Sequence, residues 1–445
     1  MTKKVTLSIL AIVLAGCVLL SAALILVAVL IARGSTSSTT VAPTATESSI
    51  DMQMDEIQSQ VQSYRGLTMT QPLSRALLST DELKDHVINE FFADYTDENA
   101  KDDAEELSAF GLLPKDFDLH DFYVKLYSEQ IAGYYDNQTK DMYVVSDEGF
   151  GGTERMTYAH EFTHVLQDQT YDMENGLKIN DDYCQDHSEY CAAVTALIEG
   201  DATLSEQYWY YKYSTDQDKQ QIDEFQQTYT SPVYDSAPAY MKEDFLFPYS
   251  QGLDFVSSLY KQGQWKAVDA AYQNPPVSTE QIIHPEKYPN DEPIDVTLPD
   301  LLKTLGKNWR EVDRNTMGEW YTYLLLADGR DASFRLEDQT AKDASAGWGG
   351  DAYIYYTNDS NDEFAMVWKS VWDTSADKEE FWQASQTYGQ DRWGDPQQQG
   401  QDSISWNTTD DGYFTMVDTG SAVLWVMAPS AEVNAQLTAA LEAGN

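Results

Sequence analysis

The sequence predicts an α+β protein with a mainly helical core, a small hairpin inside that core, and a C-terminal α+β subdomain. Apolar residues recur at helical spacing in much of residues 52–130, and again in 188–212 and 247–272. Strand-forming residues at 131–145 surround a turn-rich stretch, which indicates a hairpin. Strand-like and helical segments alternate over residues 331–445, as expected for an α+β unit packed on the core.

At 445 residues the chain is long enough for two domains after its N-terminal segment. We expect a cytoplasmic N-terminus at 1–4, a transmembrane anchor at 5–33, a Ser/Thr-rich linker at 34–51, a core domain at 52–330 and the C-terminal subdomain at 331–445.

The N-terminal segment predicts a membrane anchor. Two lysines precede an apolar run at residues 5–32, which Arg33 closes. The run exceeds the roughly 20 residues that a helix needs to cross a bilayer, and its flanking charges favour a cytoplasmic N-terminus. Cys17, which ends a Leu-Ala-Gly-Cys stretch, leaves a lipoprotein as the alternative; a cleaved signal peptide fits less well. Either anchor holds the bulk of the chain outside the cytoplasm, at the cell membrane.

The charge of the chain restricts its partners. There are 74 acidic and 28 basic residues, for a net charge of −46. Such a charge repels phosphates and anionic surfaces, so we expect no nucleic-acid partner.

Residues 153–169 contain the pattern His-Glu-x-x-His, with His160, Glu161 and His164. Residues four apart on a helix share one face, so the two imidazoles can bind one metal ion. Glu161 falls beside the open coordination position, where a general base for a water nucleophile must stand. With six histidines in the chain, chance would produce this pattern only about 0.01 times.

A catalytic zinc site usually has three protein ligands. The expected third ligand is Glu199, in a second helical stretch at about 188–212. Gly200 would let the two helices approach closely. Asp201 is the rival ligand but points to another helical face. We place Asp201 and Asp168 behind the ligands; Asp168 either orients an imidazole or is a solvated acid.

Cys184 and Cys191 are the only cysteines outside the anchor. In an exported chain, two cysteines this close in sequence predict a disulfide. Seven residues within one helix would separate them by about 10 Å, so Cys184 should precede the helix that Cys191 enters. His187, between them, is most simply structural, with an alternative metal ligand as the other reading.

A hydrolase that activates water on a metal ion needs a donor for the oxyanion formed when water attacks a carbonyl. His284 is the candidate donor, beside a structural reading, and Tyr288 is a weaker candidate.

The segments His160-Glu161-Phe162-Thr163-His164 and Glu199-Gly200-Asp201-Ala202 together resemble the gluzincin type of metallopeptidase, in which two His and a downstream Glu hold zinc. The Glu-Gly-x-Ala run is similar to the third-ligand segment of the membrane alanyl aminopeptidase family. The 34 residues between the second His and Glu199 exceed that family's connection, and its Gly-Ala-Met-Glu-Asn exopeptidase motif is missing. The resemblance covers about 50 residues and implies a zinc site in a zincin-like core. It also implies that residues 142–145 of the hairpin bind an extended peptide by strand addition, as an edge strand of zincins does; a purely structural hairpin is the alternative.

The wider region from about Arg65 to Trp320 resembles an uncharacterised bacterial group of predicted membrane-anchored zinc peptidases. The matching runs are residues 129–136 and 278–288. Together with the motif, this resemblance implies an extracytoplasmic peptidase that uses one zinc ion and acts on peptides or proteins, most simply as an endopeptidase. A catalytically inactive zincin-fold binding module and an exopeptidase are the alternatives.

Overall fold

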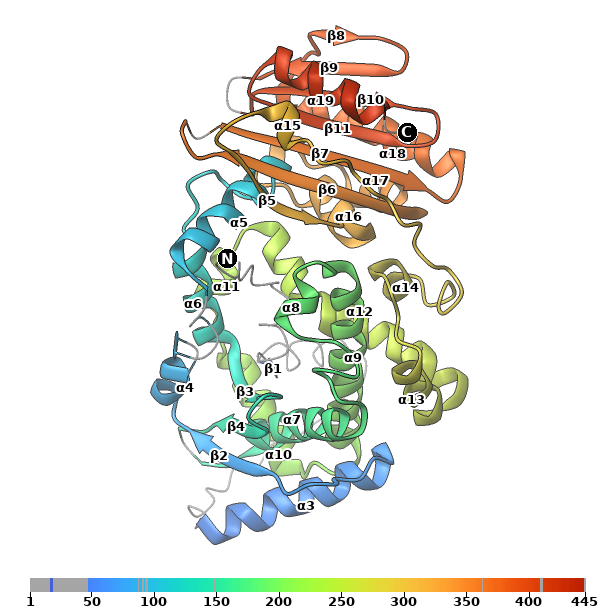
Figure 1. Ribbon diagram of the computed structural model, residues 1–445. Coiled ribbons are helices and arrows are strands. Elements are labelled where there is room, and N and C mark those ends of the chain that lie inside the picture. The colour runs from blue at the N-terminus through green and yellow to red at the C-terminus, as the bar shows by residue number, and fades with distance from the viewer. Residues whose placement is uncertain are drawn as a thin grey trace.

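The structure is a computed structural model that describes residues 17–18, 47–86, 88–89, 92, 95–147, 149–361, 363–408 and 411–443. Over these residues the fold is mixed α+β, as predicted (Figure 1). Apart from Cys17–Val18, the predicted anchor at 5–33 lies outside the described residues, as does the linker up to residue 46. The last residues assigned to the linker are helical, because α3 begins at Glu47.

No helix in the described ranges is both long enough and apolar enough to cross a membrane.

The first unit contains most of the helices and one small sheet. Its elements are β1 (Cys17–Val18), α3 (Glu47–Arg65), β2 (Ser74–Leu78), α4 (Thr80–His86), α5 (Asp97–Phe110), α6 (Leu119–Gln130), β3 (Ile131–Tyr135), β4 (Asp141–Val145), α7 (Gly152–Tyr171), α8 (Asp181–Cys184), α9 (Ser188–Lys212), α10 (Asp216–Thr228), α11 (Pro232–Ser236), α12 (Ala239–Gly263), α13 (Trp265–Gln273) and α14 (Thr279–Ile283).

Helix α9 is the centre of this unit, between α7 and α12 (Figure 1). Its closest contact is with α12. A Cβ added to Gly200 would lie 2.1 Å from the carbonyl oxygen of Gly252, and one added to Gly252 would lie 2.2 Å from that of Ala196. Only glycine allows two helix backbones to approach this far. Gly200 therefore permits a close helix pair, as predicted, but the partner is α12 and not the helix of the His-Glu-x-x-His motif.

The small sheet has the strand order β1-β3-β4-β2. β3 and β4 form the predicted antiparallel hairpin, and β2 adds to β4 in parallel. Strand β4 thus has a neighbour on both sides. The interpretation that residues 142–145 form a free edge for peptide addition is wrong, because β2, far away in sequence, covers that edge.

The predicted disulfide between Cys184 and Cys191 is confirmed, with a Cα–Cα distance of 5.7 Å. Cys184 ends the short helix α8, and Cys191 lies in the first turn of α9. The bond joins the loop after α7 to the start of α9.

The second unit is built on an antiparallel sheet of seven strands in the order β5-β6-β7-β11-β10-β9-β8. Its elements are α15 (Leu302–Leu305), β5 (Trp309–Asn315), α16 (Gly318–Ala327), α17 (Asp338–Ser345), β6 (Trp348–Asn358), β7 (Glu363–Trp372), α18 (Ser375–Trp393), β8 (Gln398–Gln399), β9 (Ser403–Asn407), β10 (Tyr413–Asp418), β11 (Val423–Ala428) and α19 (Ala431–Ala443). The expected boundary at residue 331 is too late, because β5 already belongs to this sheet.

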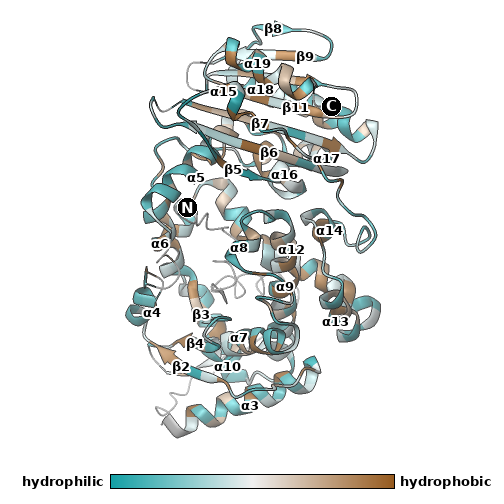
Figure 2. Cartoon of the chain, in the orientation of Figure 1, coloured by the Kyte–Doolittle hydropathy of each residue, from teal (hydrophilic) through white to brown (hydrophobic). Residues whose placement is uncertain are grey.

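Both faces of the large sheet are buried, and alternate residues of β6 show how. Tyr353 and Tyr355 join the main core with α16, α17 and α18, whereas Ile354 and Tyr356 pack with α19 in a separate cluster. Hydrophobic residues recur along β6 and β7 (Figure 2). Successive side chains of a strand point to opposite faces of the sheet, and helices cover both faces here. The sheet is therefore the middle layer between helices.

Helix α16 fastens the sheet to the helical unit. Its first amides, of Met317 and Gly318, donate to Asp351 of β6, each at 2.9 Å. At its other face, Trp320 and Tyr321 donate to Asp244 of α12 at 2.9 and 2.7 Å.

We predict that Gly200→Ala destabilises the protein by about 1–3 kcal/mol, because the new methyl group overlaps the backbone of α12. Thermal unfolding monitored by circular dichroism would show a lowered Tm. The matched control is Gly263→Ala at the end of α12, where the nearest atom to an added Cβ is the methyl of Ala267 at 3.0 Å, and its effect should be smaller. An unchanged Tm for Gly200→Ala would contradict the close crossing.

Candidate metal centre

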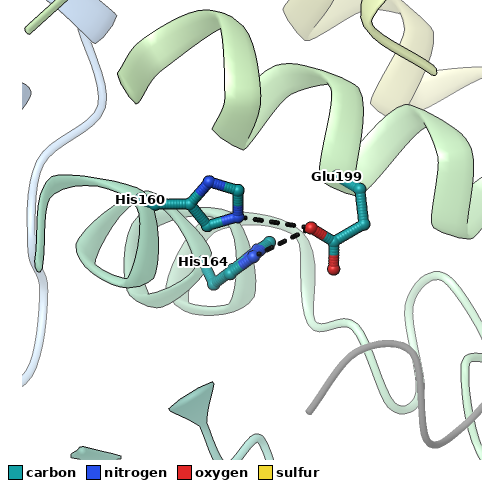
Figure 3. Close-up of side chains that lie close together, drawn as sticks. All are labelled: His160, His164 and Glu199. Atoms are coloured by element: carbon teal, nitrogen blue, oxygen red, sulfur yellow. Dashed lines mark hydrogen bonds and ion pairs between the residues drawn. The ribbon is translucent and has the colours of Figure 1, made fainter. Parts of the chain in front are cut away.

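Three buried side chains from two helices meet at one point. His160 and His164 lie one turn apart on α7, and Glu199 reaches them from α9 (Figure 3). Glu199 Oε2 lies 3.3 Å from His160 Nε2 and 3.5 Å from His164 Nε2. The exposed fractions of the three residues are 1, 2 and 0%. The structure thus brings together the three residues that the sequence predicted as metal ligands.

Each imidazole uses its other nitrogen for a protein contact. His160 Nδ1 lies 2.9 Å from Glu206 Oε2, and His164 Nδ1 lies 2.8 Å from Gln167 Oε1. Both acceptors favour a proton on Nδ1, which leaves Nε2 for a metal ion. Sequence reasoning missed Glu206, although it lies two helical turns after Glu199 on the same face of α9, a spacing that could have revealed it.

The charges of these groups depend on one another. Burial opposes the positive charge of His160, but hydrogen bonds and attraction from Glu199 and Glu206 outweigh it and raise the pKa to about 10. The pKa of His164 is raised as well: burial opposes its charge, and Glu199 overcomes that effect. Burial also opposes the charge of Glu199, yet the two imidazoles lower its pKa to about 2. In the metal-free protein these groups therefore form a buried ion cluster.

The donor set fits zinc. Two imidazole nitrogens and one carboxylate oxygen lie within 4.8 Å of one another in the group. Zinc binds nitrogen and oxygen donors of these types, and three protein ligands are typical of a catalytic site. The carboxylate and amide behind the histidines match the outer contacts that commonly orient metal-bound imidazoles.

Glu161 is fully buried on α7, next to the first histidine. Strand β3 lies directly against it. A Cβ added to Gly133 would be 3.3 Å from Glu161 Cγ and 2.9 Å from the methyl of Thr157. Glycine at this position therefore lets the strand approach the helix that carries the motif.

The two aspartates that the sequence placed behind the ligands have different surroundings. Asp201 accepts a hydrogen bond from Gln167 at 2.9 Å, so it contacts His164 only through the Gln167 side chain. Asp168 instead accepts from Tyr135, Lys140 and the amide of Met173. The prediction that Asp168 orients an imidazole is wrong, because it lies at the end of α7 and binds the hairpin.

The structure does not bring His284 to the metal-binding group. Its Nε2 lies 2.8 Å from Glu319 of α16, near the junction with the large sheet. Helix α14, which it follows, contacts the start of α9, where Thr279 donates to Glu189. That point is ten residues from Glu199, about 15 Å along the helix. We therefore no longer assign His284 the oxyanion; its contacts are structural.

The two weaker candidates are also elsewhere. His187 precedes α9, stacks on Tyr183 with ring centroids 4.0 Å apart, and contacts the Tyr183 carbonyl. It lies about 18 Å along the helix axis from Glu199, too far for a shared ion. Tyr288 donates to the carbonyl of Asn274 at 2.7 Å.

A second acidic group consists of Glu280, Asp291 and Asp373. Lys287 lies among them, with its Nζ at 2.5, 3.2 and 2.7 Å from the three carboxylates. The ammonium group occupies the position among the three carboxylates that an ion would take, so we assign no metal to it.

Comparisons with known proteins bear on the second unit. Residues 303–438 match a family described as a domain of unknown function (DUF8575), a range that contains the seven-stranded sheet and α16. Searches among curated proteins and solved structures found no match.

We predict that metal binding at neutral pH releases protons and that zinc affinity rises with pH. A raised pKa near 10 means that His160 carries a proton on Nε2 below that pH, and this proton must leave before the nitrogen can bind a metal. Calorimetric titration with zinc at pH 7.5, in two buffers of different ionisation enthalpy, should show about one proton released per ion.

The matched variant is Glu206→Gln, which removes one of the carboxylates that raise the pKa of His160. Fewer protons should then leave at pH 7.5, while zinc affinity falls about 10–100-fold because the imidazole loses its orienting partner. Equal heats in both buffers for the wild type would contradict the charged state of His160.

Proposed function

We propose that the protein is a membrane-anchored, extracytoplasmic zinc peptidase with a zincin-like core. The observation that carries this proposal is the meeting of His160, His164 and Glu199, with Glu161 adjacent to the first ligand on the same helix. A helix with this motif, a glutamate from a following helix and a hairpin packed on the motif helix agree with the gluzincin resemblance. One zinc ion is the proposed cofactor, and peptides or proteins are the proposed substrates.

The residues divide the work as follows. His160, His164 and Glu199 hold the ion, while Glu206 and Gln167 accept the Nδ1 protons and keep Nε2 directed at it. When bound, zinc would lower the pKa of a water molecule and polarise the scissile carbonyl. Glu161 takes a proton from the attacking water and returns it to the leaving amine. Its complete burial favours proton transfer, because bulk water does not compete.

The proposed location agrees with the confirmed disulfide. Disulfides persist in oxidising compartments and are rare in the cytosol. The bond between Cys184 and Cys191 therefore supports a position of this unit outside the cytoplasm. In this proposal residues 5–33 form the anchor, with lipidation at Cys17 as the alternative.

Glu161→Gln should reduce hydrolysis of a denatured protein substrate by about 10²–10⁴-fold or more and leave the zinc content near one ion per chain, because it removes the base but no ligand. The full chain would be purified in detergent, with peptide release and metal content measured together. Glu189→Gln, at a buried carboxyl group of α9, is the control and should keep full activity. Wild-type rates from Glu161→Gln would rule out the mechanism.

Metal content by mass spectrometry tests the ligands separately. Wild-type protein reloaded with zinc should hold about one ion per chain, and Glu199→Ala much less, since a site with two ligands binds weakly. A wild type without zinc would refute the proposal. Zinc without peptide hydrolysis would favour an inactive binding module, and cleavage only of peptides with free ends would indicate an exopeptidase.

A further inference from the structure

Behind His164, a chain of hydrogen bonds runs through the interior to an arginine on another helix. Gln167 Oε1 faces His164, and Gln167 Nε2 donates to Asp201 at 2.9 Å. Arg65 donates two hydrogen bonds to the same aspartate, from Nε at 2.8 Å and from Nη2 at 3.0 Å. Gln167, Asp201 and Arg65 are all fully buried. A buried ion pair with this geometry holds both groups in one orientation.

The orientation of the Gln167 amide follows from its surroundings. Three acceptors face its nitrogen: the carbonyl of Ile198 at 3.0 Å, Asp201 at 2.9 Å and the hydroxyl of Tyr272 at 2.9 Å. The Tyr272 hydroxyl gives its own proton to Asp201 at 2.8 Å, so it accepts from the amide. A reversed amide would point its oxygen at these acceptors. The oxygen must therefore face His164.

This orientation decides where His164 carries its proton. An amide oxygen only accepts, so His164 Nδ1 must donate to it. When the ring is neutral, as it is when it binds a metal ion, its lone pair is on Nε2, the nitrogen that faces Glu199. His160 reaches the same state through direct contact with the carboxylate of Glu206. His164 instead depends on Gln167 and Asp201, which are held from outside α7 and α9 by the hydroxyl of Tyr272 in α13 and by the guanidinium of Arg65 in α3.

Arg65 is the last residue of α3, the helix that follows the predicted anchor and linker. Helix α3 packs on α7 and α9, and Arg65 also bonds Asp269 of α13 at 2.6 Å and lies 4.8 Å from the ring centre of Trp265. If α3 left its place, Asp201 would lose the guanidinium that balances its charge and keep only the hydrogen bonds from Gln167 and Tyr272. A buried carboxylate without a cation is unfavourable, so the group that orients the Gln167 amide would be disturbed.

We propose that Arg65 is a positioning residue of the metal centre, which holds His164 in its metal-binding tautomer through Asp201 and Gln167. The packing of α3 against α7 and α9 and the affinity of the site for the metal are therefore coupled. This inference rests on the proposed zinc site. Such coupling is reciprocal. If the packed position of α3 strengthens zinc binding by some factor, bound zinc must favour that packed position by the same factor. The segment next to the membrane anchor thereby regulates the metal centre.

The test is a double-mutant cycle on zinc affinity, measured with the full chain in detergent by competition with a chromophoric chelator. Gln167→Met removes the acceptor and should weaken zinc binding about 10–100-fold. Arg65→Met should weaken it by about tenfold or more. Because both act through one chain of bonds, the double variant should bind about as weakly as Gln167→Met alone.

Arg392→Met is the matched control. Arg392 is a buried arginine in the last turn of α18 and donates to Asp411 at 2.8 Å and to the carbonyl oxygen of Ala109 in α5 at 3.1 Å. Its loss should lower the stability of the protein but leave zinc affinity unchanged. If Arg65→Met does not fold, Arg65→Lys is the substitute, because it keeps the positive charge but cannot donate both hydrogen bonds to Asp201. Its zinc affinity should lie between those of the wild type and Gln167→Met.

Hydrogen exchange of the α3 amides gives a second readout. Zinc should slow exchange in the wild type, and this effect should vanish in Gln167→Met, in which α3 itself is unaltered. Wild-type affinity in both single variants, or additive losses in the double variant, would overturn the inference and leave the zinc site intact. A wild type that binds no zinc would refute the proposed function and this inference together.

Discussion

Helix α9 carries four carboxylates into the interior, and the arrangement of the helical unit follows from the need to satisfy them. A buried carboxylate is strongly unfavourable unless a donor or a positive charge meets it. The pairs are Glu189 with Thr279, Glu199 with both motif histidines, Asp201 with Arg65, and Glu206 with His160. These partners come from α14, α7 and α3, so a hydrogen-bonded α14 and the ion-paired α7 and α3 are held around α9 in addition to apolar packing. The close crossing with α12 at Gly200 excludes water from the remaining side.

Local sequence patterns predicted the parts of the site that lie within one or two helices. The four-residue step placed His160 and His164 on one face, the next helical stretch offered Glu199, and the spacing of the cysteines predicted their bond. The hairpin before α7 and most strands of the second unit were predicted from alternation and turn residues. These features depend on short-range geometry, which a single sequence contains.

Long-range partners were beyond that reasoning. Arg65 lies 136 positions before the aspartate that it binds, and nothing in its neighbourhood marks it as a core residue. The wrong assignments have the same origin. Asp168 shares a helical face with the ligands, but the end of α7 directs it to the hairpin, and His284 belongs to a helix that meets the other end of α9. Strand β2 was missed as the cover of β4, since parallel pairing between distant segments has no local signal.

The attachment of α16 has a consequence for the boundary of the second unit. The matched range of 303–438 includes this helix, whose Trp320, Leu324 and Leu325 belong to the same apolar core as Val194 and Leu197 of α9. A boundary at residue 303 therefore passes through a hydrophobic core and not through a linker. Isolated from its neighbours, the domain would expose a contiguous apolar surface of the kind that causes aggregation. In this chain the helical unit covers α16, so residues 303–438 are part of a larger folded body and need that companion surface.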